Sequence, residues 1–128
     1  MNNSSIIFAP ISIGELFDKI TILHIKKDRI KGIGLRNVTK EINYLEEVVE
    51  TNNLKVDNQL FTDLKKINTC LWEIEDKIRI KDSKNEFDHE FIKLARSVYK
   101  ENDKRASLKK EINLKYGSIL VEEKSYKT

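Results

Sequence analysis

Six apolar side chains between residues 58 and 81 recur at intervals of four, three, four, three and four residues. This heptad spacing places them on one stripe of an α-helix, as in helices that pack lengthwise against a neighbour. The stripe predicts a long helix over residues 58–81, with Asp57 as its N-cap. Its members are Leu60, Leu64, Ile67, Leu71, Ile74 and Ile78.

Residues 13–31 form another predicted helix, which carries apolar side chains on two faces. Ser12 followed by Glu15 is a capping-box pattern, in which the serine oxygen accepts an early helix N–H and the glutamate reaches back. A helix that is apolar on two sides lies centrally in its domain or faces a second partner. One face carries Ile13, Leu16, Phe17, Ile20 and Leu23, and the nearly opposite face carries Ile22 and Ile25.

Two further helices complete the predicted fold. Gly32 and Gly34 interrupt the chain after the first helix, and Asn37 is expected to cap a helix over residues 38–51. A last helix is expected over residues 88–115, ending before Gly117. Short connections favour antiparallel neighbours. We therefore expect residues 1–128 to form one all-α domain, a bundle of three to four long antiparallel helices.

The two ends of the chain have apolar character outside these helices. Residues 6–8 and 118–122 contain Ile, Leu, Val and Phe side chains. An extended, two-stranded pairing of these ends is an alternative to two separate coils.

Composition agrees with this fold and excludes some functions. Charged residues make up 35% of the chain and apolar residues 39%, a mixture that suits helices with one apolar stripe. The net charge of +3 is too balanced to indicate nucleic acid by itself. With one cysteine, no apolar run of membrane-spanning length and no signal-peptide pattern, we expect a cytoplasmic protein without membrane contact. Cys70, His24 and His89 show no metal-ligand spacing, so we expect neither metal nor cofactor.

A polar interruption in the last predicted helix is the main candidate site. Asn102, Arg105 and Lys109 fall in the middle of the face that carries Phe91, Leu94, Val98, Ile112 and Tyr116. Such conflicts between local pattern and core packing gather at functional sites.

Arginine on this face could bind a carboxylate or phosphate through two parallel hydrogen bonds. Its counterpart within the chain could be Glu75 or Asp76, in the stretch that ends at Arg79. The alternatives are a structural ion pair or a helix that leaves the core here.

The start of the first helix is the second candidate site. Glu15 and Lys19 are four residues apart, the spacing of an ordinary surface pair. Asp18 shares a face with Ile22 and Ile25, so its burial requires a partner. A basic residue of the last helix or of a second subunit would serve.

Lys93, Arg96, Lys100 and Lys104 form a basic stripe along the last helix. Such a stripe can contact phosphates. Because Glu101 and Glu111 lie nearby and few aromatic residues are interleaved, a solvated face is favoured over nucleic-acid binding.

Three stretches, at residues 13–23, 71–79 and 91–99, resemble an uncharacterised family of short bacterial and phage proteins. The likeness continues through Asn102-Asp103, Arg105-Ala106, Gly117-Ser118 and Glu122-Glu123-Lys124, and so covers almost the whole chain. It implies a complete family member, and it supplies neither an activity nor a functional residue.

A second likeness is to the small all-helical chorismate mutases, which dimerise and have a long first helix with an acidic residue before an Ile/Leu run. This sequence departs from them where a substrate carboxylate would bind, because no arginine lies in the first half of residues 13–31.

These patterns favour a non-enzymatic interaction or regulatory module that forms a homodimer and acts through a protein partner. The heptad stripe, the two-sided first helix and the lack of a catalytic constellation support this reading. One alternative is a small helical enzyme or binding protein for an anionic metabolite, with a pocket around Arg105. Another is a nucleic-acid binder that uses the basic stripe.

Overall fold

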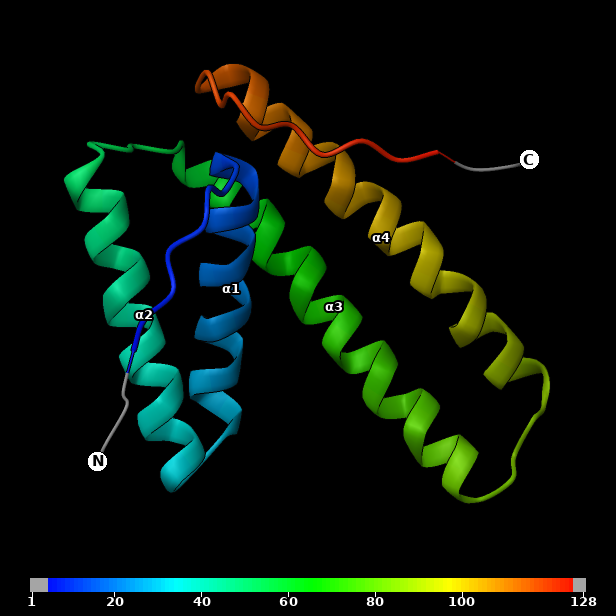
Figure 1. The fold of residues 1–128 in the computed structure, drawn as a ribbon. Coiled ribbons are helices and arrows are strands. Elements are labelled where there is room, and N and C mark those ends of the chain that lie inside the picture. Colours follow the sequence, from blue (N-terminus) through cyan, green and yellow to red (C-terminus); the bar gives the residue numbers. More distant parts are fainter. Residues whose placement is uncertain (1–4, 126–128) are drawn as a thin grey trace.

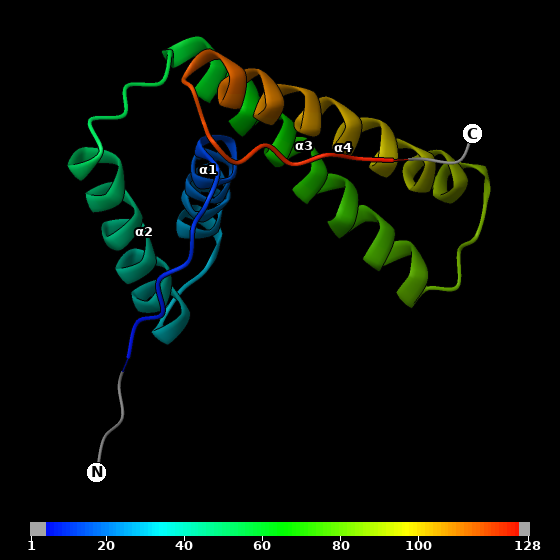
Figure 2. The ribbon, with the colours of Figure 1, turned by 45° about the horizontal axis from the view of Figure 1, so that its top comes forward.

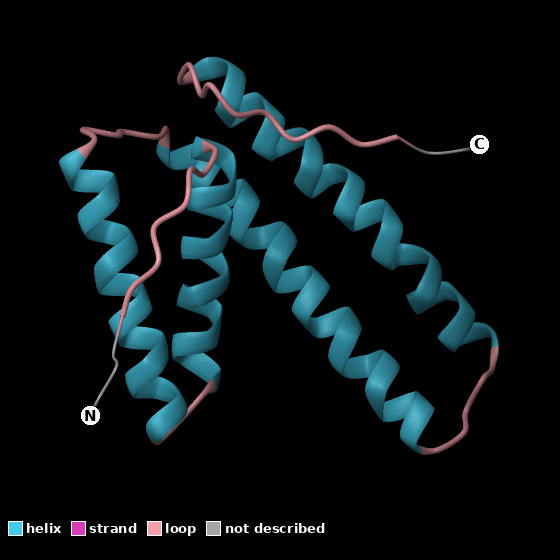
Figure 3. Ribbon diagram, in the orientation of Figure 1, coloured by secondary structure: helices cyan, strands magenta, loops and turns pink. Residues whose placement is uncertain are grey.

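A computed structural model describes residues 5–125, and it contains four helices and no strand within that range (Figures 1 and 3). The all-α prediction is therefore confirmed. The helices are α1 (Ile13–Arg29), α2 (Ile33–Thr51), α3 (Asn58–Ser83) and α4 (His89–Lys115).

The helices form two antiparallel hairpins of different length. α1 pairs with α2, and the longer α3 pairs with α4 (Figure 1). α1 packs against all three other helices, whereas the far half of the α3–α4 hairpin projects away from α1 and α2 in both views (Figures 1 and 2). We call this projecting half, residues 72–99, the arm.

Two core clusters flank α1, and both include a residue of its first predicted apolar face. On one side, Phe17 packs with Leu60 and Leu64 of α3 and Ile112 of α4. On the other side, Leu23 packs with Val38 and Ile42 of α2. On the opposite predicted face, Ile25 is buried, and Ile22 is partly buried and lines a cavity. The chain itself therefore covers most of both faces, and the pattern of α1 no longer calls for a second subunit.

The predicted N-caps of α1 and α3 are confirmed, and Asp88 caps α4, which begins one residue after the predicted start. Ser12 Oγ accepts the Glu15 N–H at 3.0 Å, Asp57 accepts from Gln59, and Asp88 accepts the Phe91 N–H at 3.0 Å. α4 is followed by Gly117 at φ 70°, and the Ser118 N–H donates to Asn113 O at 2.8 Å. This is the long-range hydrogen bond of a Schellman motif.

The prediction for α2 was wrong by five residues, because the helix starts at Ile33 and not at residue 38. Gly32, at φ 69°, turns the chain by itself and occupies the N-cap position. Gly34 then lies in the first turn and Asn37 inside the helix, where neither breaks it.

Two helix ends also differ slightly from prediction. α1 ends at Arg29 and not at residue 31, because Ile30 is already extended. α3 continues to Ser83, two residues beyond the predicted end at 81.

The chain ends do not pair as strands within residues 5–125. Instead, the segment after α4 runs back along that helix (Figure 2) and contacts the start of α1 through side chains. Ser118 Oγ accepts the Ile13 N–H at 3.1 Å, and Ser12 Oγ donates to Glu122 Oε1 at 2.8 Å. The apolar pattern had suggested a backbone ladder, whereas polar side chains make the connection.

α1 and α4 approach closely at Gly14. A Cβ atom added there would lie 2.4 Å from the Lys109 carbonyl oxygen and 3.0 Å from Asn113 Oδ1. The Gly14 N–H donates to Asn113 Oδ1 at 2.6 Å, and this hydrogen bond is buried, since Asn113 is only 1% exposed. The missing side chain at Gly14 therefore sets how closely the two helices meet, and it places the polar face of α4 against α1.

Candidate functional site at the junction of α1, α3 and α4

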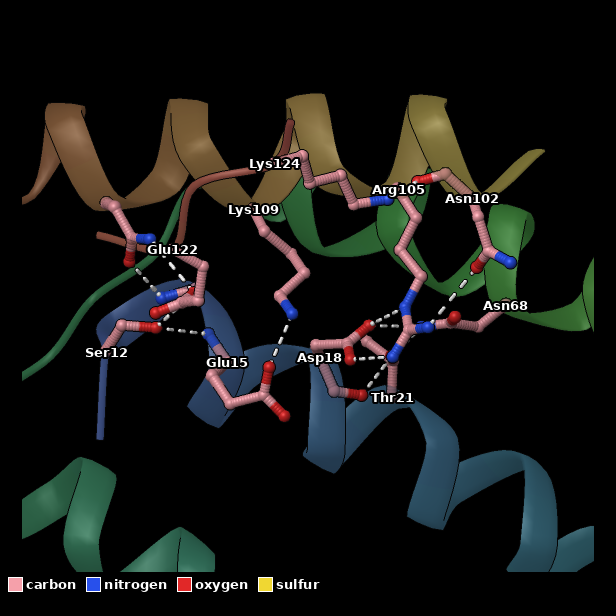
Figure 4. A network of polar contacts seen from close by, with 12 residues as sticks. Ser12, Glu15, Asp18, Thr21, Asn68, Asn102, Arg105, Lys109, Glu122 and Lys124 are labelled. Atoms are coloured by element: carbon pink, nitrogen blue, oxygen red, sulfur yellow. Dashed lines mark hydrogen bonds and ion pairs between the residues drawn. The ribbon is translucent and has the colours of Figure 1, made fainter. Parts of the chain in front are cut away.

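The polar residues of α4 face α1, as Figure 4 shows. Asp18 of α1 is fully buried and lies opposite Arg105. Arg105 Nε donates to Asp18 Oδ1 at 2.9 Å, and Nη2 donates to Oδ2. The hydrogen bond to Asp18 raises the pKa of Arg105 above its ordinary value. The pairing is thus the structural ion pair foreseen as an alternative. The suggested counterparts Glu75 and Asp76 were wrong.

Asn68 of α3 completes the surroundings of Asp18. Its Nδ2 donates to Asp18 Oδ1 at 2.9 Å and to Thr21 Oγ1 at 2.8 Å, while the Thr21 hydroxyl donates to the Asp18 carbonyl at 2.7 Å. A buried carboxylate is tolerated when its charge and its lone pairs are satisfied, as they are here. The network therefore links α1, α3 and α4 in one geometry.

The other predicted polar residues take different partners. Lys109 pairs with Glu15, so the glutamate does not complete a capping box. Lys19 lies 3.7 Å from Glu41 of α2, and the expected surface pair with Glu15 does not form. Arg105 Nη1 lies 3.5 Å from Asn102 Oδ1, a weak contact.

A cavity of about 450 Å³ adjoins the network on the side of the arm. It brings together five of the predicted residues, which are Glu75, Asp76, Arg79, Asn102 and Arg105. Ile22, Leu71, Trp72 and Asn68 complete its lining. Glu15, Asp18 and Lys19 line a separate cavity of about 290 Å³ on the other side of the ion pair, where Arg105 also contributes.

Two buried amides were not predicted, Asn68 at 5% exposure and Asn113 at 1%. Both lie beside apolar positions of their helices, next to Ile67 and Ile112. The position of each amide at the edge of an apolar stripe could have indicated that it is buried. A buried amide needs hydrogen-bond partners, so the same position could have indicated a polar contact between helices.

The chain matches a family of unknown function, DUF6165, over residues 7–128. The chain belongs to the DUF6165 family. This confirms the resemblance to an uncharacterised family. No curated protein and no solved structure matches the chain, so the likeness to chorismate mutases gains no support.

The basic stripe of this DUF6165 chain is exposed. Lys104 pairs with Glu101 at 3.0 Å, and Lys93, Arg96 and Lys100 form no ion pair with a described residue. Three exposed charges of α4 therefore remain available, two on the arm and one just beyond it.

The remaining reactive groups of this DUF6165 chain lie apart from one another. Within residues 5–125 there is no group of three or more His, Cys, Asp or Glu side chains arranged to hold a metal ion. His24 Nε2 lies 3.6 Å from Glu46, beyond hydrogen-bond distance. Cys70 is a free, partly buried thiol, and burial raises its pKa. None of the four helices is both long enough and apolar enough to span a membrane.

Proposed function

We propose that this chain is a non-enzymatic interaction module that forms a homodimer through the arm and acts, as a dimer, on a protein partner. One observation carries the proposal. Between Trp72 and Glu111, Ile74 is the only buried residue. The halves of α3 and α4 that form the arm therefore have little of the tertiary cover on which helices in proteins depend.

The arm carries the apolar side chains that such cover would bury. Ile78, Phe91, Leu94 and Val98 are only partly buried. Ile80, Phe87, Ile92 and Tyr99 are between 53% and 57% exposed. A two-helix hairpin leaves two sides open, and a second hairpin against one side forms a four-helix bundle.

The charges of the arm favour a second copy as the occupant. Glu75 and Asp76 of α3, Lys93 and Arg96 of α4, and Lys100 just beyond the arm form no ion pair with any residue in the range 5–125. In a two-fold dimer, α3 of each chain can face α4 of the other, which brings the acidic and basic residues together twice. One arm is therefore complementary to itself.

The four groups with a resolved pKa shift offer no general acid or base tuned to neutral pH. A general acid or base works best with a pKa near the working pH. Here the resolved pKa shifts lead away from neutrality: Cys70, Lys81 and Arg105 are raised, and Asp88 is lowered. The free thiol of Cys70 also fits the expected cytoplasmic location, where thiols stay reduced.

Sedimentation equilibrium over a wide concentration range tests the dimer. We expect a monomer–dimer equilibrium that Ile92→Glu and Tyr99→Glu shift toward the monomer without loss of helical circular dichroism. Tyr44→Glu, at an exposed position of α2, is the matched control and should leave the equilibrium unchanged. A monomer at all concentrations, or an equal effect of the control, would refute the proposal.

A further inference from the structure

We propose that the cavity between α1, α3 and α4 binds a ligand that carries an ammonium or guanidinium group. This goes beyond the proposed function, because it requires no second copy. The cation comes either from a small amine or from a basic side chain of another chain, and the two sources offer the same chemistry.

The charge balance of the cavity favours a cation. Arg105 is compensated by the buried Asp18, so this pair adds no net charge. Glu75 and Asp76 then contribute two negative charges against one positive charge from Arg79, leaving −1. Asp18 thus neutralises the positive charge of Arg105, which had suggested a pocket for an anion.

Asn68 adds an acceptor whose orientation is fixed. Its Nδ2 is held by Asp18 Oδ1 and by Thr21 Oγ1, whose own hydrogen goes to the Asp18 carbonyl. Rotating the amide by half a turn would place its oxygen against the Asp18 carboxylate, where two acceptors would repel each other. The amide atom that faces away from Asp18 is therefore Oδ1. That oxygen has no hydrogen-bond partner among residues 5–125, and Asn68, 95% buried, lines the cavity. A donor from the ligand would satisfy it.

The apolar part of the cavity suits the stem of such a ligand. Ile22, Leu71 and Trp72 provide contact surface for an alkyl chain. The Trp72 ring already attracts one cation, since the Arg29 guanidinium lies 5.7 Å from its centroid. The volume of about 450 Å³ is within the range of small-ligand sites. Carboxylates, a free amide oxygen and an aromatic wall together recognise an aliphatic cation.

Trp72 is the only tryptophan of the chain and therefore reports on the cavity directly. We would titrate the protein with n-butylammonium and n-butylguanidinium chloride at constant ionic strength and follow Trp72 fluorescence. Saturable changes are expected with both cations and not with sodium butyrate. Glu75→Gln/Asp76→Asn should weaken binding about tenfold or more. Glu47→Gln/Glu50→Gln, an equal charge change on exposed positions of α2, should not.

A second arm of the experiment separates the two sources. If the second copy supplies the cation, Lys93→Gln/Arg96→Gln/Lys100→Gln should strengthen binding of the amine, and the amine should lower dimer formation. If the source is a small amine, that variant should bind as the native chain does. Absence of saturation, an equal response to butyrate, or unchanged binding in Glu75→Gln/Asp76→Asn would overturn the proposal, and none of these results bears on whether the arm dimerises.

Discussion

Replacing Arg105 by leucine should strongly destabilise the fold, because it leaves Asp18 charged and buried. The side chain of Asp18 has 0% exposure, whereas that of Arg105 has 28%. Removing one partner of a buried pair typically costs about 3–5 kcal/mol. We expect Arg105→Leu to fall in this range and Asp18→Asn to cost less, about 1–3 kcal/mol, since water can reach the remaining guanidinium.

The two changes together test the cause. In Asp18→Leu/Arg105→Leu no buried charge remains, so the double variant should be more stable than Arg105→Leu alone. Asn68 still has Thr21 as an acceptor in this variant.

Urea unfolding followed by circular dichroism measures these differences. Arg36→Leu is the control, because Arg36 is exposed on α2, outside the arm, and forms no ion pair within residues 5–125. Its effect should stay within about 0.5 kcal/mol. If Arg105→Leu costs no more than Arg36→Leu, or Asp18→Asn costs more than Arg105→Leu, the network does not act as a buried ion pair.

Three further results are expected. Gly14→Ala should lower the free energy of unfolding in urea by about 1–3 kcal/mol, because the added Cβ meets the α4 backbone. Gly34→Ala is the control and should lower it less, because its Cβ meets only the Ile30 side chain. The Lys81 hydrogen bond lowers the pKa of Asp88 below 3.8, so its stabilisation is present above that pH and is lost as pH falls through the lower value. The protection factor of the Phe91 amide, which is its exchange rate relative to the unfolded chain, should fall there. Since burial raises the pKa of the Cys70 thiol, iodoacetamide at pH 8 should react more slowly with the folded chain than in urea, and equal rates would contradict this.

Local signals predicted the helices, while tertiary pairing was harder to read. The caps at Ser12 and Asp57 depend on a few neighbouring residues, and they gave the starts of α1 and α3 correctly. The start of α2 was missed, because one glycine in the left-handed region turned the chain where two had been expected to break it.

The candidate site was predicted in part. A polar interruption in an apolar face identified Asn102, Arg105 and Lys109, and burial of Asp18 implied a basic partner. Helical phase does not say which of several carboxylates lies opposite an arginine, so Glu75 and Asp76 were preferred to Asp18, 87 positions away from Arg105. To place Asp18 opposite Arg105, one must know where α1 crosses α4. That crossing depends on the close contact at Gly14, which the periodicity of the sequence does not reveal.

The contact between the start of α1 and the segment after α4 has a consequence for synthesis. The ribosome releases the amino-terminal part of a chain first, and folding can begin there. Ser118 and Glu122, which bind Ile13 and Ser12, emerge more than a hundred residues later. The amino end of α1 is therefore secured by residues that are made more than a hundred positions after it. Until they arrive, the nascent chain holds an α1–α2 hairpin that lacks both this contact and the partner of Asp18.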